Sequence, residues 1–71
     1  MKIIVYFSEC EHDGDFDHYK TDVNLSGGTI LASELNESEE VGILTVEVNN
    51  YDLWIEKFKE TDSYGFSQYG I

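Results

Sequence analysis

VGILTVEVNNYDLWIEKFKE, residues 41–60, is the stretch that decides the fold, because the spacing of its apolar residues changes partway along it. From Val41 to Val48 the side chains alternate between two faces, a period of two that is typical of a strand. After Val48 the spacing lengthens to about 3.6 residues, the period of an amphipathic helix. The apolar stripe of that helix consists of Tyr51, Trp54, Ile55 and Phe58. The stretch therefore predicts a strand that leads directly into a helix.

The residues around this stripe place the helix at about Asn50–Glu60. Asn49 is a suitable N-cap, and Asp52 puts an acid in the first turn, near the positive end of the helix dipole. Trp54 is the only tryptophan, and it lies in the middle of the apolar stripe. We therefore expect Trp54 to be buried against a sheet.

The N-terminal part of the chain is expected to supply strands and loops. Lys2–Ser8 is apolar on both faces, which suits a strand in the middle of a sheet or in a sheet covered on both sides. Glu9–Asp17, ECEHDGDFD, is predicted to be a polar loop or the rim of a hairpin, and His18–Leu25 alternates as a half-buried strand does. Ser26–Gly28 is expected to form a tight turn, because glycine supplies the positive φ that hairpin turns need.

Two of the remaining segments suit more than one structure. Thr29–Ser33 suits a returning strand or the start of a short helix, and the strand is favoured. Asn36–Glu40, NESEE, is predicted to be an acidic loop, and Ser63–Ile71 suits a short terminal strand or a loose aromatic tail. The chain therefore predicts a single α+β domain over residues 1–71. In it, a three- to four-stranded antiparallel sheet has one amphipathic helix (about Asn50–Glu60) packed on a face.

The composition indicates where such a domain would be found. A single cysteine, Cys10, excludes an internal disulfide, and secreted domains of this size usually need such bonds. The apolar run Ile3–Phe7 is too short for a signal peptide or a membrane span. A cytoplasmic protein is therefore expected.

The charge balance excludes several classes of ligand. Asp and Glu number 15 against four Lys and no Arg, which gives a formal net charge of −11. Nucleic acids and anionic membranes are bound by patches of Lys and Arg, so neither is expected as a direct ligand. Hydrophobic residues make up 41% of the chain and recur with clear periods, which argues against disorder.

Residues 10–18 hold the densest group of side chains able to ligate a metal: Cys10, His12, Asp13, Asp15, Asp17 and His18. The three aspartates match the first ligand positions of an EF-hand calcium loop. The match then fails, because His18 stands at the sixth position in place of glycine and Asn24 at the twelfth in place of glutamate. One cysteine and two histidines also lack the paired spacing of zinc sites.

Nucleophilic catalysis by Cys10 is also disfavoured. The neighbouring charges of Glu9 and Glu11 should raise the pKa of its thiol and so reduce the amount of thiolate. A non-enzymatic protein without a cofactor is therefore expected. Metal binding by the acidic loop is kept as the third-ranked alternative.

Many of the acidic residues lie in three groups along the chain, and the net charge alone does not explain this grouping. The groups are Asp13, Asp15 and Asp17; Glu37, Glu39 and Glu40; and Asp52, Glu56 and Glu60. In an extended chain the first group would project on one side, with carboxylates roughly 6–7 Å apart. On the predicted helix the last group would form a ridge at positions i, i+4 and i+8. A solvated surface or a halophile's acidic coat is the alternative explanation, but such a coat would not by itself concentrate charge into rows.

In size, charge and predicted fold class, the chain resembles the small acidic proteins of phages and mobile elements that act as nucleic-acid mimics, such as anti-CRISPR and anti-restriction proteins. ECEHDGDFD (residues 9–17), NESEE (residues 36–40) and the helical ridge carry the resemblance. It implies a non-enzymatic inhibitor that occupies the nucleic-acid-binding site of a host or defence protein in the host-cell cytoplasm. The partner would be a basic CRISPR effector, restriction enzyme or repair enzyme.

The placement of the acids predicts which residues meet this partner. They are the carboxylates of the three groups together with the two that flank Cys10: Glu9, Glu11, Asp13, Asp15, Asp17, Glu37, Glu39, Glu40, Asp52, Glu56 and Glu60. The alternative from a different class is a small structural or adaptor protein that regulates a partner through its sheet edge or tail.

Overall fold

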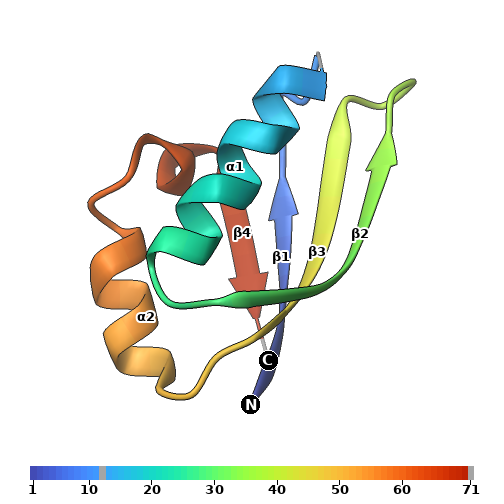
Figure 1. Ribbon diagram of the computed structural model, residues 1–71. Helices are drawn as coiled ribbons and strands as arrows, with labels where there is room; N and C mark the ends of the chain where they lie inside the picture. The colour runs from blue at the N-terminus through green and yellow to red at the C-terminus, as the bar shows by residue number, and fades with distance from the viewer. Residues whose placement is uncertain (12, 71) are drawn as a thin grey trace.

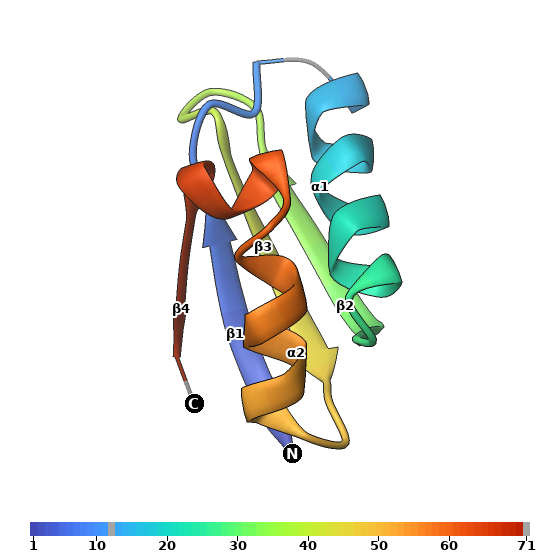
Figure 2. The ribbon, with the colours of Figure 1, turned by 90° about the vertical axis from the view of Figure 1, so that its left-hand side faces the viewer.

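The computed structural model describes residues 1–11 and 13–70, with Asp13 described by its backbone alone. The elements follow in the order β1 (Lys2–Phe7), α1 (Asp13–Leu25), β2 (Thr29–Asn36), β3 (Val41–Glu47), α2 (Tyr51–Phe58), the 3₁₀-helix η1 (Asp62–Phe66) and β4 (Ser67–Gly70). The strands form one antiparallel sheet in the order β2-β3-β1-β4, and α1 and α2 lie against the same face of it (Figure 1, Figure 2). The predicted α+β class and antiparallel sheet are confirmed, and a second helix is added.

β1 is an interior strand, paired with β3 on one side and with β4 on the other. Ile3, Val5 and Phe7 point toward the helices and are buried, whereas Ile4 and Tyr6 lie on the opposite face. No helix in the described part of the chain covers this outer face, and Tyr6 is 48% exposed. The apolar pattern of residues 2–8 therefore belongs to a central strand with one open face.

The predicted strand over His18–Leu25 is wrong, because this segment is the greater part of α1. Phe16, Tyr19 and Val23 recur with helical spacing, and all three are buried against the sheet. Leu25 is 77% exposed, although a strand would have placed it on the same face as Tyr19 and Val23. The helix is therefore selected by a stripe that begins at Phe16, inside the segment predicted to be a loop.

The turn at Ser26–Gly28 forms, but it ends a helix instead of joining two strands. The Gly28 N–H donates to the Val23 carbonyl (3.1 Å) and the Gly27 N–H to the Asn24 carbonyl (3.0 Å), which is the Schellman arrangement of a helix C-terminus. Gly27 has φ of 104°, a value that residues with a Cβ rarely adopt. The chain then enters β2, which confirms the favoured alternative for residues 29–33 and extends to Asn36.

α2 begins one residue later and ends earlier than predicted. Asn50 is the N-cap in place of Asn49, and its Oδ1 accepts a hydrogen bond from the Leu53 N–H (3.1 Å). The helix ends at Phe58, so Glu60 lies in the turn that follows it.

Trp54 is buried as predicted, with 2% of its surface exposed. Its ring stacks on Phe58 with 4.7 Å between centroids, and its Nε1–H donates to the Val23 carbonyl (3.2 Å). Because Val23 lies near the end of α1, this hydrogen bond joins the two helices. Trp54 therefore holds α1, α2 and the sheet together.

The C-terminal segment contains the predicted short strand, but it begins later than expected. Tyr64 and Phe66 belong to η1, and β4 starts at Ser67 and pairs with β1. Tyr69 on β4 packs against the core, and its ring contacts Trp54 edge to face (6.2 Å between centroids). The aromatic residues of this segment are thus part of the packed domain, and Ile71 lies outside the described residues.

Candidate interaction surface

Three acidic segments meet at one end of the molecule, which we call the acidic end. β1 and β2 both run toward it, and α1 and β3 both start from it (Figure 1). The acidic end consists of the loop after β1, the first turn of α1 and the turn between β2 and β3. Its acidic residues are Glu9, Glu11, Asp13, Asp15, Glu37, Glu39 and Glu40. The fold therefore joins two groups of acids that are separate in the sequence.

Backbone hydrogen bonds hold these segments in place. The Cys10 N–H donates to the Glu40 carbonyl at 2.8 Å, which links the loop after β1 to the β2–β3 turn. The Asn36 Oδ1 accepts from the Ser38 hydroxyl (2.8 Å) and from the Glu39 N–H (3.2 Å), an arrangement that fixes the turn. The acidic end is therefore built on an ordered backbone.

Two glutamates at the acidic end have backbone conformations that non-glycine residues rarely adopt. Glu9 has φ of 56° and Glu40 has φ of 58°. A non-glycine residue in this left-handed region is disfavoured by roughly 1–2 kcal/mol. The Cys10–Glu40 hydrogen bond joins the two loops that carry these residues, and helps to keep both loops in this conformation.

The aromatic ring of Phe16 attaches the start of α1 to the sheet at Gly42. A Cβ atom at Gly42 would lie 2.6 Å from Phe16 Cδ1, so only glycine leaves room for the ring. The outer side of the ring faces Lys20, whose Nζ lies 4.9 Å from the ring centroid. This contact places the first turn of α1 next to the β2–β3 turn, because Gly42 is the second residue of β3, which follows that turn.

Two cations of the described chain pair with acids that do not belong to the acidic end. Lys20 pairs with Asp17 (3.3 Å between Nζ and Oδ1), and the N-terminal amine pairs with Glu47 (3.3 Å). Among the described residues, no lysine forms an ion pair with the five exposed glutamates of this end: Glu9, Glu11, Glu37, Glu39 and Glu40. Among the described residues, no ion pair therefore offsets their negative charge.

The predicted row of Asp13, Asp15 and Asp17 does not form, because these residues lie on a helix and not in an extended loop. Successive helical residues are about 100° apart, so Asp15 and Asp17 lie on different sides of α1. Asp15 is partly buried, and Asp17 is exposed and paired with Lys20. Asp13 begins α1, and its side chain lies outside the described residues.

The helical ridge is formed only in part. Asp52 and Glu56 are exposed on α2 as predicted, whereas Glu60 lies beyond the helix end. α2 begins at the end of the molecule opposite the acidic end, and Lys57 and Lys59 lie between these acids in the sequence (Figure 1). This group is therefore separate from the acidic end.

Cys10 is a buried free thiol with 2% of its surface exposed. Burial raises the pKa of this thiol, Asp15 raises it further, and a backbone hydrogen bond from Gly42 lowers it in part. The predicted direction is thus confirmed, but the main cause is burial and not the adjacent glutamates. Such a thiol is a poor nucleophile.

The other candidate metal ligands are dispersed in the structure. His18 lies on α1 with its Nε2 3.4 Å from Asp22 Oδ2, and His12 lies outside the described residues. Among the described residues, no group of three or more His, Cys, Asp or Glu side chains is arranged to hold a metal ion.

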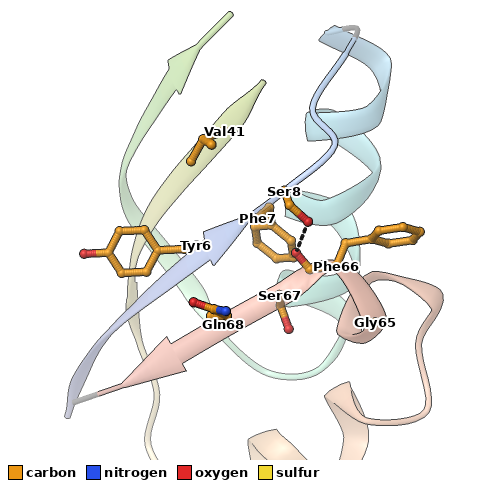
Figure 3. A pocket seen from close by; sticks show the side chains of 8 residues that line it. All are labelled: Tyr6, Phe7, Ser8, Val41, Gly65, Phe66, Ser67 and Gln68. Atoms are coloured by element: carbon orange, nitrogen blue, oxygen red, sulfur yellow. Dashed lines mark hydrogen bonds between the residues drawn. The ribbon is translucent and has the colours of Figure 1, made fainter. Parts of the chain in front are cut away.

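A hollow of about 370 Å³ lies beside the acidic end, and sequence reasoning did not predict it (Figure 3). Its lining residues come from β1, β3, η1 and β4: Tyr6, Phe7, Ser8, Val41, Gly65, Phe66, Ser67 and Gln68. The sequence feature that could have indicated this hollow is the apolar character of both faces of residues 2–8, which places Tyr6 on an uncovered face of the sheet.

No protein-family model, curated protein or solved structure matches this chain. Within the described residues, the longest helix is too short and too polar to cross a membrane.

Proposed function

We propose that this protein is a non-enzymatic inhibitor that uses its acidic end to occupy the nucleic-acid-binding site of a basic host or defence protein. The observation that carries the proposal is the meeting of Glu9, Glu11, Glu37, Glu39 and Glu40 at one end without ion pairs to the described lysines. A site that binds phosphates through Lys and Arg accepts carboxylates of similar density by the same electrostatics.

The geometry supports this proposal because the carboxylates are mounted on a fixed backbone. The Cys10–Glu40 hydrogen bond and the Asn36 turn reduce the freedom that binding would otherwise remove. Truncating one partner of a desolvated carboxylate–arginine pair costs about 2–5 kcal/mol, much of it because the remaining charge is left buried and unpaired. Negative charge held in this way favours both rapid association and correct orientation.

The partner class follows from the same electrostatics. A CRISPR effector, restriction enzyme or repair enzyme presents a basic nucleic-acid channel, and an anti-CRISPR protein is the leading version of this proposal. Such an inhibitor acts in the host-cell cytoplasm, without a cofactor or a catalytic step.

The experiment is a competition assay with a partner captured from the native host and eluted by a salt gradient. The protein and nucleic acid should compete for one site on that partner, and binding should weaken steeply as salt increases. Simultaneous binding of the protein and nucleic acid would contradict mimicry.

Two triple variants with the same loss of charge identify the surface that binds. Changing Glu37, Glu39 and Glu40 to glutamine should abolish binding, whereas changing Asp52, Glu56 and Glu60 to the matching amides should have little effect. All six residues are exposed, so neither variant should unfold the protein. Equal losses in the two variants would show that net charge, and not the acidic end, drives the interaction.

A second candidate is an adaptor that binds its partner through a sheet edge. β4 is an edge strand, and its four residues carry no charge that would oppose pairing with another strand. Partner binding that is insensitive to salt and is lost on changes in β4 would favour this candidate.

A further inference from the structure

The hollow beside the acidic end presents apolar surface that the core does not use. Tyr6 is 48% exposed and Val41 is partly buried, whereas the Phe66 ring stacks on Tyr19 of α1 (5.8 Å between centroids). Tyr6, Val41 and Gln68 lie on the outer side of the sheet (Figure 3). An occupant of the hollow would therefore contact an aromatic ring and aliphatic groups.

The hydroxyl groups of the hollow are already engaged. The Ser8 hydroxyl donates to the Phe66 carbonyl (3.3 Å), and the Ser67 hydroxyl donates to the Tyr64 carbonyl (2.8 Å). These serines help to close the junction of η1, β4 and β1, and they have little remaining capacity to donate to a ligand. The hollow is thus suited to apolar contact more than to the recognition of a polar group.

Negative charge lies directly next to this apolar surface. Ser8 precedes Glu9 and Val41 follows Glu40, and the Cys10–Glu40 hydrogen bond holds the two loops together. Both glutamates are exposed. A phosphate or a carboxylate would be repelled here, whereas a side chain with an apolar stem and a cationic head would match both features.

We propose that the hollow receives an arginine side chain of the basic partner, with the aliphatic stem on Val41 and the guanidinium stacked on the Tyr6 ring and paired with a carboxylate of the acidic end. This inference rests on the proposed function for the identity of the partner. Arginine is favoured over lysine, because a guanidinium stacks on an aromatic face and binds carboxylates through two parallel hydrogen bonds. The hollow is then the place where the interface gains specificity beyond charge.

The test compares an oligoarginine and an oligolysine peptide of equal length, titrated into the full chain and followed by backbone amide NMR shifts. Oligoarginine should bind about two- to fivefold more tightly, the preference expected for cation–π contact at an exposed site. Its binding should shift the amides of Ser8, Val41 and Gln68. Tyr6→Leu, which keeps an apolar side chain without the ring, should remove the preference for arginine. Leu53→Ala on α2, where the wild-type residue is 54% exposed, is the control and should keep it.

Two results would overturn the inference: equal affinity of the two peptides for the wild type, or an unchanged arginine preference in Tyr6→Leu. The two peptides could bind the wild type equally, and the glutamine variant of Glu37, Glu39 and Glu40 could bind both more weakly. The proposal that the hollow binds arginine would then be refuted, while the proposal that the acidic end binds cations would be kept. If neither peptide shifts residues of the hollow or the acidic end, the hollow is again refuted. The proposed function is then decided separately by the competition assay with the native partner.

Discussion

Replacing Gly42 by alanine tests how the start of α1 is held beside the acidic turn. The new Cβ would lie 2.6 Å from Cδ1 and 3.0 Å from Cζ of Phe16. Carbon atoms in favourable contact are about 3.5–4.0 Å apart, so the ring needs to move by roughly 1 Å. Phe16 is 4% exposed and has little space for this movement.

The size of the effect follows from two opposing terms. Overpacking of this kind costs about 1–3 kcal/mol. Restricting the unfolded chain by a glycine-to-alanine change returns about 0.4–1 kcal/mol. We expect a net loss of about 1–2 kcal/mol in the free energy of unfolding. In a domain of this size, that corresponds to a decrease in Tm of roughly 4–16 °C.

The assay is thermal and urea unfolding, followed by circular dichroism, of a double-mutant cycle. Gly42→Ala should cost less in a Phe16→Leu background, because the smaller side chain leaves room for the new methyl group. Gly14→Ala is the control: nothing lies within 4 Å of its Cβ position, so this change in α1 should stabilise the protein by up to about 1 kcal/mol.

The cycle has a clear negative outcome. The Gly42→Ala variant could have the same Tm as the wild type, or it could lose the same free energy of unfolding with Phe16 as with leucine at that position. Either result would show that the Phe16 ring does not hold α1 against β3. The acidic end would then lack the structural support assigned to it.

Three further predictions concern the core and its titrating groups. Trp54→Ala should lower the free energy of unfolding by about 3–5 kcal/mol, and a variant that keeps its cooperative urea transition near that of the wild type would contradict the packing of the helices. Cys10 should react with iodoacetamide much more slowly in the folded protein than in urea, and equal rates would show that the thiol is accessible. Burial and a side-chain hydrogen bond with Tyr64 raise the pKa of Tyr69 from 10.0 to about 12. The folded form therefore binds more protons between these two values, so stability is unaffected below pH 10.0 and decreases as the pH rises toward 12. Tyr69→Phe should show a smaller alkaline loss in urea unfolding, and an unchanged loss would assign the effect to other groups.

The sequence by itself determined those elements whose apolar spacing matches either the strand period of two residues or the helix period of about 3.6, but not both. Residues 41–48 alternate over their whole length, and 41–47 of them form β3, whereas the stripe through Trp54 and Phe58 has only helical spacing. The cap moved from Asn49 to Asn50 because adjacent asparagines are equally able to cap. Net charge also follows from sequence alone, because it does not depend on where the residues lie.

In contrast, the spacing of Tyr19 and Val23 could not identify α1 as a helix. Residues four apart share a face in a strand as well as in a helix, so this pair matches both periods. Phe16 distinguishes the two, because an odd spacing of three places it with Tyr19 on a helix and opposite to it in a strand. The charged residues around Phe16 favoured the loop prediction and hid this signal.

Only the tertiary structure decided which acids lie together. Glu9 and Glu40 are distant in the sequence, and they meet because β1 and β2 run in the same direction on either side of β3. Strand order and direction depend on packing across the whole sheet and leave no local pattern in the sequence. For the same reason, Asp52 and Glu56 lie on a different surface, since α2 starts from the opposite end of the sheet (Figure 1).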